Sequence, residues 1–291
     1  MTLSALLIQP FVDYGFMRRA LVAGAALALG SAPIGTLLVL RRMSLVGDAM
    51  AHALLPGAAL GFLAAGFSLA AMSLGGFVAA LAVALAAGFV TRATAQREDA
   101  SFAAFYLMAL ALGVLLVSTH GSSVDLMHVL FGTILAVDDA ALCLMAGVAS
   151  VTLLTLAVVY RPLVVECVDP GFLRSVGGRG PAVHMLFLVL TVANLVAGFQ
   201  ALGTLMAVGL MMLPATAARF WAGEVWSLAL AAGVIALVSS FAGLLLSFHA
   251  EWPSGPAIVL VAGAIYLLSV IAGPREGLLW RLFQRGRHRV A

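Results

Sequence analysis

The chain has 291 residues, of which 64% are hydrophobic and 9% are charged, and its mean hydropathy is +1.15. Soluble domains carry about 25% charged residues, so this sequence cannot cover an ordinary water-facing surface, and a helical membrane protein is predicted. The net charge of +3 comes from arginines near the ends of apolar runs, which does not indicate a nucleic-acid-binding groove.

The chain contains no lysine, because all 15 of its basic residues are arginine. The phosphate-binding loop of an ordinary ATPase needs a lysine that reaches the phosphates. If ATP drives this protein, a separate subunit must therefore hydrolyse it. No HExxH, GxSxG or serine–lysine pattern is present, so a membrane enzyme is the least expected class of protein.

Long uncharged runs predict the membrane spans, since about 20 apolar residues cross the hydrocarbon layer. The run 49–91 is too long for one helix and is expected to divide near residues 66–68. The run 181–218 has a polar dip at Asn194 and Gln200 and is expected to form two short or broken helices. In chain order the predicted spans are 20–40, two within 49–91, 100–119, 140–160, two within 181–218, 225–250 and 253–273.

We therefore expect an all-α polytopic membrane protein with eight or nine transmembrane helices, forming a single transmembrane domain over residues 1–291. Residues 121–137 are less apolar and are expected to form an interfacial segment or a short helix. Residues 161–180 form the largest polar interruption and are expected to be a loop. Residues 274–291 are expected to be a terminal tail.

The arginines predict which connections face the cytoplasm. In a nine-span arrangement they follow the first, third, fifth, seventh and ninth spans, and this one-sided distribution is typical of cytoplasmic connections. It places the loop 161–180 and the C-terminus in the cytoplasm and the N-terminus outside. Arg18 and Arg19 are an exception, because they precede the first span.

Asp48 and His52 stand four positions apart near the start of the second span, so they share one face of a helix. A carboxylate and an imidazole in an apolar run are costly unless they are paired or functional. Their oxygen and nitrogen atoms suit Zn²⁺ or Mn²⁺. An aspartate that favours the helix start, with a histidine packed against a neighbour, is the open alternative.

Prolines and glycines inside the spans are candidates for helix breaks or gating positions. Pro56 and Gly57 follow His52 closely, and Pro214 lies in the seventh span. Broken helices often line substrate paths in transporters. The alternative is that Gly57 and Gly61 pack closely against a neighbouring helix.

Other histidines lie near the predicted span ends. His120, His128 and His249 fall on the outer side, where they are candidates for weak contacts with an incoming cation or are simply solvated. His184 stands near the start of a span and is expected to cap that helix or reach the interface.

The segment 169–177 is expected to form a short helix in the cytoplasmic loop. Asp169 suits the N-cap, Pro170 the first helical position and Gly177 the end. Phe172, Leu173 and Val176 then supply an apolar face, which either a cytoplasmic partner or the lipid surface could cover.

Five stretches resemble the permeases of zinc and manganese ABC importers, in the order found in that family and across nearly the full chain. They are residues 41–57, 130–137, 169–177, 213–219 and 253–259. The resemblance implies a homodimer in the bacterial inner membrane, two copies of a separate ATPase on the cytoplasmic side, and a periplasmic metal-binding protein. It implies no permanently bound cofactor, with ATP bound only by the partner subunits.

The resemblance also assigns roles to residues. Asp48 and His52 match positions thought to line the ion path and hold the metal transiently, although Ala51 stands where many members have serine. The residues that match the family's ATPase-coupling helix are Asp169, Pro170, Phe172, Leu173, Arg174, Val176 and Gly177.

We expect the permease subunit of an ATP-driven importer of divalent metal that works by alternating access. Zinc is favoured, since residues 163–171 and 200–212 are more similar to zinc permeases. The alternatives are a manganese permease of the same family, or a proton-coupled secondary metal transporter in which Asp48 carries the proton. A cobalamin or siderophore permease is disfavoured, because it needs no intramembrane Asp48–His52 pair.

Overall fold

The computed structural model describes residues 6–280 except 67, 95 and 121–136, and every element in this part of the chain is a helix. Eight of these helices are long and apolar enough to cross a membrane. The expected all-α polytopic fold is therefore confirmed. In chain order the helices are α2 (Gln9–Asp13), α3 (Gly15–Leu40), α4 (Ser44–Ala65), α5 (Leu69–Ala93), α6 (Glu98–His120), α8 (Asp139–Val168), α9 (Pro170–Ser175), α10 (Gly180–Leu202), α11 (Thr204–Ala218), α12 (Val225–Ala250) and α13 (Ser254–Ala272).

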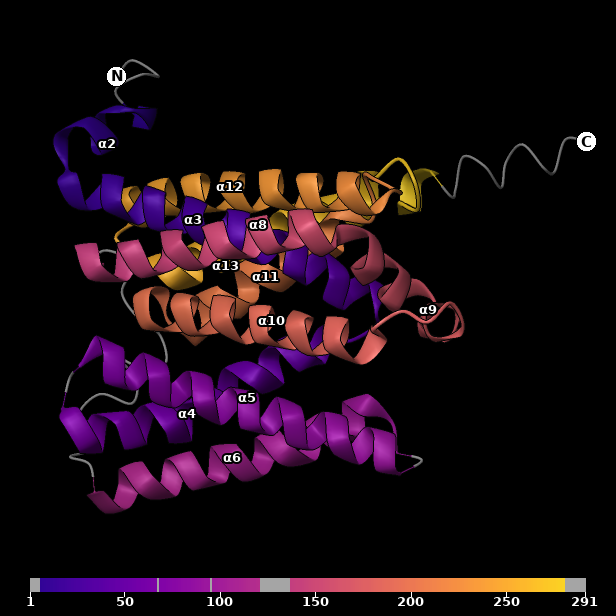
Figure 1. The fold of residues 1–291 in the computed structure, drawn as a ribbon. Helices are drawn as coiled ribbons and strands as arrows, with labels where there is room; N and C mark the ends of the chain where they lie inside the picture. The colour runs from indigo at the N-terminus through magenta and orange to yellow at the C-terminus, as the bar shows by residue number, and fades with distance from the viewer. Residues whose placement is uncertain (1–5, 67, 95, 121–136, 281–291) are drawn as a thin grey trace, which may run out of the picture.

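The long helices run side by side and share two common ends (Figure 1). The connections that contain Arg41, Arg97, Arg179 and Arg219 lie at the end that carries α9, which we call the α9 end. The turn at Gly66 and the start of α3 lie at the opposite end. The α11 helix has 15 residues, which is about 22 Å of helix, and it is shorter than the eight candidate spans.

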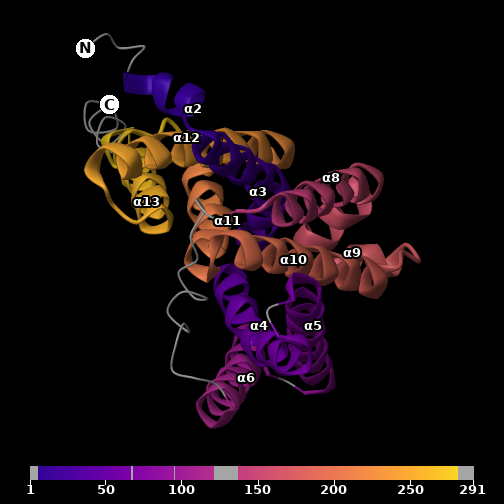
Figure 2. The same ribbon diagram turned by 90° about the vertical axis from the view of Figure 1, so that its left-hand side faces the viewer.

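Two groups of helices meet on α10. Figure 2 shows α4, α5 and α6 together on one side of α10, with α3, α8, α11, α12 and α13 on the other. Buried side chains such as Met50, Phe102 and Phe187 fill the space between α4–α6 and α10. A second buried group, which includes Met17 and Leu244, lies around α3, α8 and α12.

Helix α3 is the most deeply buried of the candidate spans, and its glycines allow this. A Cβ atom at Gly35 would lie 2.0 Å from the carbonyl oxygen of Met211 in α11. One at Gly24 would lie 3.0 Å from the Cβ of Ser240 in α12. Small residues of this kind let helix backbones approach closely where no water competes for contact.

The two longest apolar runs each divide into two helices, as predicted, although α10, with 23 residues, is not one of the short helices that were expected. Gly66, with a φ of 64°, ends α4 before α5, and Gly203, with a φ of 84°, separates α10 from α11. Glycine tolerates positive φ because it lacks a Cβ atom. By contrast, the helix breaks that were expected at Pro56 and Pro214 do not occur. Each proline lies inside a continuous helix.

The glycines near Pro56 serve helix packing. A Cβ atom at Gly57 would lie 1.9 Å from the carbonyl oxygen of Gly75 in α5, and one at Gly61 would lie 2.4 Å from that of Ala71. Gly113 of α6 faces Pro56 in the same way, since its Cβ would lie 3.0 Å from the proline nitrogen. The close contact of α4 with α5 and α6 therefore holds the helix that carries Asp48 and His52 in place.

The expected loop 161–180 is shorter than predicted, because α8 continues through Pro162 to Val168. A 30-residue helix can include these polar residues since Arg161 is exposed and Glu166 has a buried partner in Arg41. Only the part of this segment after residue 168 leaves the α8 helix.

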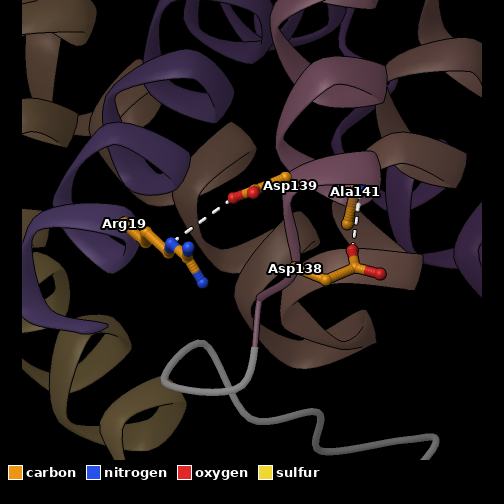
Figure 3. A network of polar contacts seen from close by, with 4 residues as sticks. All are labelled: Arg19, Asp138, Asp139 and Ala141. Carbon is orange, nitrogen blue, oxygen red and sulfur yellow. Dashed lines mark hydrogen bonds and ion pairs between the residues drawn. The ribbon is translucent and has the colours of Figure 1, made fainter. Parts of the chain in front are cut away.

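The exceptional arginines near the N-terminus have local partners, which Figure 3 shows in part. Arg19 lies 3.4 Å from a carboxylate oxygen of Asp139, and Nη1 of Arg18 donates to the carbonyl of Val12. Asp138 caps α8, because its side chain accepts a hydrogen bond from the Ala141 amide at 2.8 Å. Both members of the Arg19–Asp139 pair are exposed. Asp139 therefore neutralises the charge of Arg19, but the pair contributes little to the stability of the fold.

We expect Gly57→Ala to destabilise the fold by about 1–3 kcal/mol, because the added methyl overlaps a backbone oxygen that cannot rotate away. The midpoint of thermal unfolding, followed by loss of the monodisperse gel-filtration peak in detergent, measures this. Gly88→Ala on α5 is the control, since no atom lies within 4 Å of its Cβ position. Equal midpoints for the two variants would contradict the packing argument.

Candidate functional site

Asp48 and His52 face each other on the first turns of α4, as their spacing predicts. Oδ1 of Asp48 lies 3.6 Å from Nε2 of His52. The aspartate side chain is 55% exposed in the single chain and the histidine side chain is 28% exposed. The pair is therefore accessible, although its neighbours Ala49, Met50 and Ala51 are buried.

The pair lines a cavity of about 340 Å³ between α4, α11 and α13. Apart from Asp48, His52 and Thr204 its walls are apolar, so a cation inside it would find few polar groups besides this pair. The remaining lining residues are Leu205, Val208, Gly209, Met212, Leu213 and Val259. Sequence reasoning missed them, because nothing in the sequence shows that α11 and α13 face the start of α4.

The protein partly encloses the imidazole of His52. Its Nδ1 atom is buried and has no hydrogen-bond partner among the described residues. The imidazole stacks on Tyr106 of α6, with ring centroids 6.1 Å apart and planes inclined by 27°. Tyr106 thus restricts the ring from one side. It was not predicted, since a lone tyrosine in a span gives no signal in the sequence.

Asp48 and His52 offer a metal ion two donors of different kinds. Carboxylate oxygen suits Mn²⁺ and imidazole nitrogen suits zinc, iron and related ions. Within the described residues no group of three His, Cys, Asp or Glu side chains could hold a metal. A transport path needs such incomplete coordination, because the ion must also leave.

The outer histidines stay candidates only. His249 is exposed near the end of α12, and its Nδ1 lies 2.9 Å from the carbonyl oxygen of Leu245. His120 is the last residue of α6, but its side chain is not among the described ones. His128 lies outside the described residues. The predicted gating role of Pro56, Gly57 and Pro214 likewise stays a prediction.

The short helix α9 has the caps that the sequence predicts. A carboxylate oxygen of Asp169 accepts a hydrogen bond from the Phe172 amide at 2.9 Å, as an N-cap does. Gly177 follows the helix with a φ of 74°, and the Gly178 amide bonds the Leu173 carbonyl at 2.8 Å. These are the features of a glycine-terminated helix end.

The apolar side chains of α9 point two ways rather than forming the single face that was expected. Phe172 and Val176 are 56% and 60% exposed, whereas Leu173 is buried. Phe172 and Val176 are thus available to a partner, and Leu173 holds α9 against the bundle. The side chains of Pro170 and Arg174 are not among the described ones.

His184 was expected to cap α10 or to reach the interface, and this was wrong. It is buried, and its Nδ1 lies 2.6 Å from Nη1 of Arg41. Arg41 in turn lies 3.8 Å from Glu166. The sequence gives no signal for this cluster, since 143 positions separate Arg41 from His184.

Comparison with known proteins now decides the family. The sequence model of the ABC 3 transport family matches residues 13–273. The chain belongs to this family. It is therefore a permease of an ABC metal importer, a multi-pass membrane subunit without ATPase activity, and ATPase and binding-protein partners follow in general from this membership.

Individual relatives match over nearly their full length. The manganese import system permease protein ScaB of Streptococcus parasanguinis is 31% identical over 278 residues, which cover 93% of this chain and 96% of that protein. The chelated iron transport system membrane protein YfeD of Yersinia pestis is 29% identical, covering 92% of this chain and 89% of that protein. The structure titled PsaBC from Streptococcus pneumoniae in complex with Fab contains a chain with a TM-score of 0.83 and 29% identity, covering 94% of this chain and 97% of that chain.

We expect Asp169→Ala to loosen α9, since loss of an N-cap side chain costs about 1 kcal/mol. Hydrogen–deuterium exchange of the peptide that spans residues 169–177 should become faster. Asp169→Asn is the matched control, because its amide oxygen still accepts the Phe172 hydrogen bond. If Ala and Asn variants exchange equally fast, the side-chain cap does not hold this helix.

Proposed function

We propose that this chain is the permease subunit of a manganese importer. Full-length similarity to a permease named for manganese import is the observation that carries the choice of ion. It favours the manganese alternative over the zinc preference drawn from residues 163–171 and 200–212. Iron is a second candidate, supported by the similarity to the chelated iron permease.

In this proposal the ion passes through the cavity between α4, α11 and α13. Asp48 supplies a carboxylate oxygen, which Mn²⁺ favours, and His52 supplies an imidazole nitrogen. Mn²⁺ binds such sites more weakly than the later divalent metals of its row. A two-residue contact is therefore suited to an ion that must bind and then leave within one transport cycle.

The surroundings of the pair restrict where the ion can dwell. Nδ1 of His52 is buried, and the stacked ring of Tyr106 limits the rotation of the imidazole. Nε2, which lies beside Asp48, is therefore the nitrogen that would bind the ion. The apolar walls at Leu205 and Val208 provide no competing ligands. Water bound to the ion would complete its coordination.

The assembly we propose is a homodimer in the bacterial inner membrane, with the α9 end in the cytoplasm. The arginines in the connections of the α9 end support this orientation, since cytoplasmic loops are enriched in basic residues. The exposed Phe172 and Val176 are then available to an ATPase subunit. A periplasmic metal-binding protein would deliver the ion at the opposite end.

The cavity, α9 and the ATPase partners together would allow transport by alternating access. ATP binding and hydrolysis in the partner subunits would displace α9, and the helices joined to it would open the cavity to one side of the membrane and then to the other. Membership of the ABC 3 transport family argues against the proton-coupled secondary carrier, because that mechanism needs no ATPase.

We expect Asp48→Ala and His52→Ala each to lower Mn²⁺ uptake by cells about tenfold or more, as loss of groups that hold a metal does. The amount of permease in the membrane should not change. Cys143→Ala is the control, since Cys143 is exposed on α8 and does not line the cavity. Wild-type uptake by an Asp48→Ala/His52→Ala double variant would remove the pair from the path.

The ion itself is tested in proteoliposomes that contain the complete importer with its binding protein. We expect radioactive Mn²⁺ to accumulate on addition of ATP, and to accumulate to a higher level than Zn²⁺ when each ion is supplied alone. Accumulation of Zn²⁺ without accumulation of Mn²⁺ would restore the zinc interpretation and refute this proposal.

A further inference from the structure

A buried charge cluster lies at the α9 end of the bundle, apart from the metal cavity. Arg41 follows the last residue of α3, Glu166 is in the last turn of α8, and His184 is the fifth residue of α10. The side chains of Arg41 and Glu166 are only 10% and 6% exposed, and His184 is buried as well. We refer to Arg41, Glu166 and His184 as the Arg41 cluster.

One guanidinium group joins two helices in this cluster. Its Nη2 lies 3.8 Å from Oε1 of Glu166 and its Nη1 lies 2.6 Å from Nδ1 of His184, while its central carbon lies 5.5 Å from the ring centroid of Phe187. Arginine can only donate hydrogen bonds, so Nδ1 of His184 accepts. Because the guanidinium group is planar and rigid, it fixes the positions of Glu166 and His184 relative to each other.

The three residues stand next to α9 and next to the start of α4. In the proposed mechanism, motion of α9 has to reach the start of α4. Glu166 stands three positions before Asp169, the cap of α9, and His184 follows α9 at the start of the next helix. Arg41 stands three positions before Ser44, where α4 begins. The connection between α3 and α4 is tight, because the Met43 amide bonds the Leu38 carbonyl at 2.9 Å.

Helix α9 itself packs mainly on α8 and α10, not on α4. A displacement of α9 can reach the helix that carries Asp48 and His52 through α10, which packs on α4. Arg41 adds a second, charged connection, since it contacts Glu166 before α9 and His184 after α9 from the beginning of the α3–α4 connection.

The cluster is poorly arranged for stability alone. Oε2 of Glu166 is buried without a hydrogen-bond partner among the described residues, and a Cβ atom at Gly180 would lie only 2.6 Å from it. A buried ion pair is weak evidence for stability, because desolvation opposes the attraction between the charges. Specific positioning of the joined helices is a better account of why the charges are buried here.

We propose that Arg41 is a positioning residue that makes the α3–α4 connection, and with it Asp48 and His52, move together with the segment that carries α9. This inference rests on the proposed function, in which α9 receives the motion of the ATPase. Without the cluster, α9 still responds to ATP, but the start of α4 no longer follows it.

The first test measures ions imported per ATP hydrolysed by the complete importer in proteoliposomes. Arg41→Met/Glu166→Leu removes both charges together, so neither is left buried alone. We expect this ratio to fall about tenfold, within the range of coupling between distant sites, while ATP hydrolysis stays within about twofold of the wild type. Arg161→Gln is the control, because Arg161 is exposed on the same helix as Glu166. An unchanged ratio in the double variant overturns the proposal.

If the double variant does not assemble with its ATPase, the same ratio is measured in Arg41→Lys. It keeps the positive charge but loses the planar fork that reaches Glu166 and His184 at once. We expect a lower ratio of ions to ATP than in the wild type. A wild-type ratio in Arg41→Lys would show that positioning by the fork is not needed.

The second test needs no metal and separates this inference from the proposed function. Hydrogen–deuterium exchange is compared with and without ATP and vanadate for the peptides spanning residues 38–47 and 169–177. In the wild type both peptides should respond, and in the Arg41 variants only the second. A response of both peptides in the variants refutes the role of Arg41. No response of residues 169–177 in the wild type instead refutes α9 as the contact with the ATPase.

Discussion

Polar groups within the apolar layer must find partners inside the protein, and this constraint organises the whole structure. Asn194 of α10 meets it by donating to the Thr152 hydroxyl of α8 and to the Leu190 carbonyl, each at 2.8 Å. Arg41 meets it by binding two other helices. Asp48 and His52 meet it only in part, since they lie beside a cavity and a nitrogen of His52 keeps no partner among the described residues. Among the described residues, unpartnered buried polar atoms thus occur at the pair that we propose for the ion path, and also at Ser31, Ser73 and Glu166.

Close packing at glycines gives that pair a defined place. The contacts of Gly57 with Gly75 and of Gly35 with Met211 bring α4 against α5 and α3 against α11. Because backbones rather than flexible side chains meet there, the helices around the cavity have little freedom to shift singly. Motion of such helices as joined bodies is what alternating access requires, and the Arg41 cluster lies where three of them meet.

Much of the helical arrangement was predictable from residue types. The helix Val225–Ala250 has the bounds that its uncharged run predicts, and Gly203 divides the run 181–218 as expected. The Asp169 cap and the Gly177 end were also predictable, since they depend on neighbours within one or two turns. The end of α8 was not, because the charge of Glu166 suggested a loop, whereas its buried partner comes from α3.

The sequence by itself determined the helices, the separate location of the ATPase, and the common face of Asp48 and His52, because these depend on local composition and helical spacing. Only the tertiary structure decided what lies around them. The cavity joins residues of α4, α11 and α13, and the Arg41 cluster joins α3, α8 and α10. Such contacts depend on which helix faces pack together, and in a chain whose spans are apolar on nearly every side the sequence pattern does not distinguish one face from another.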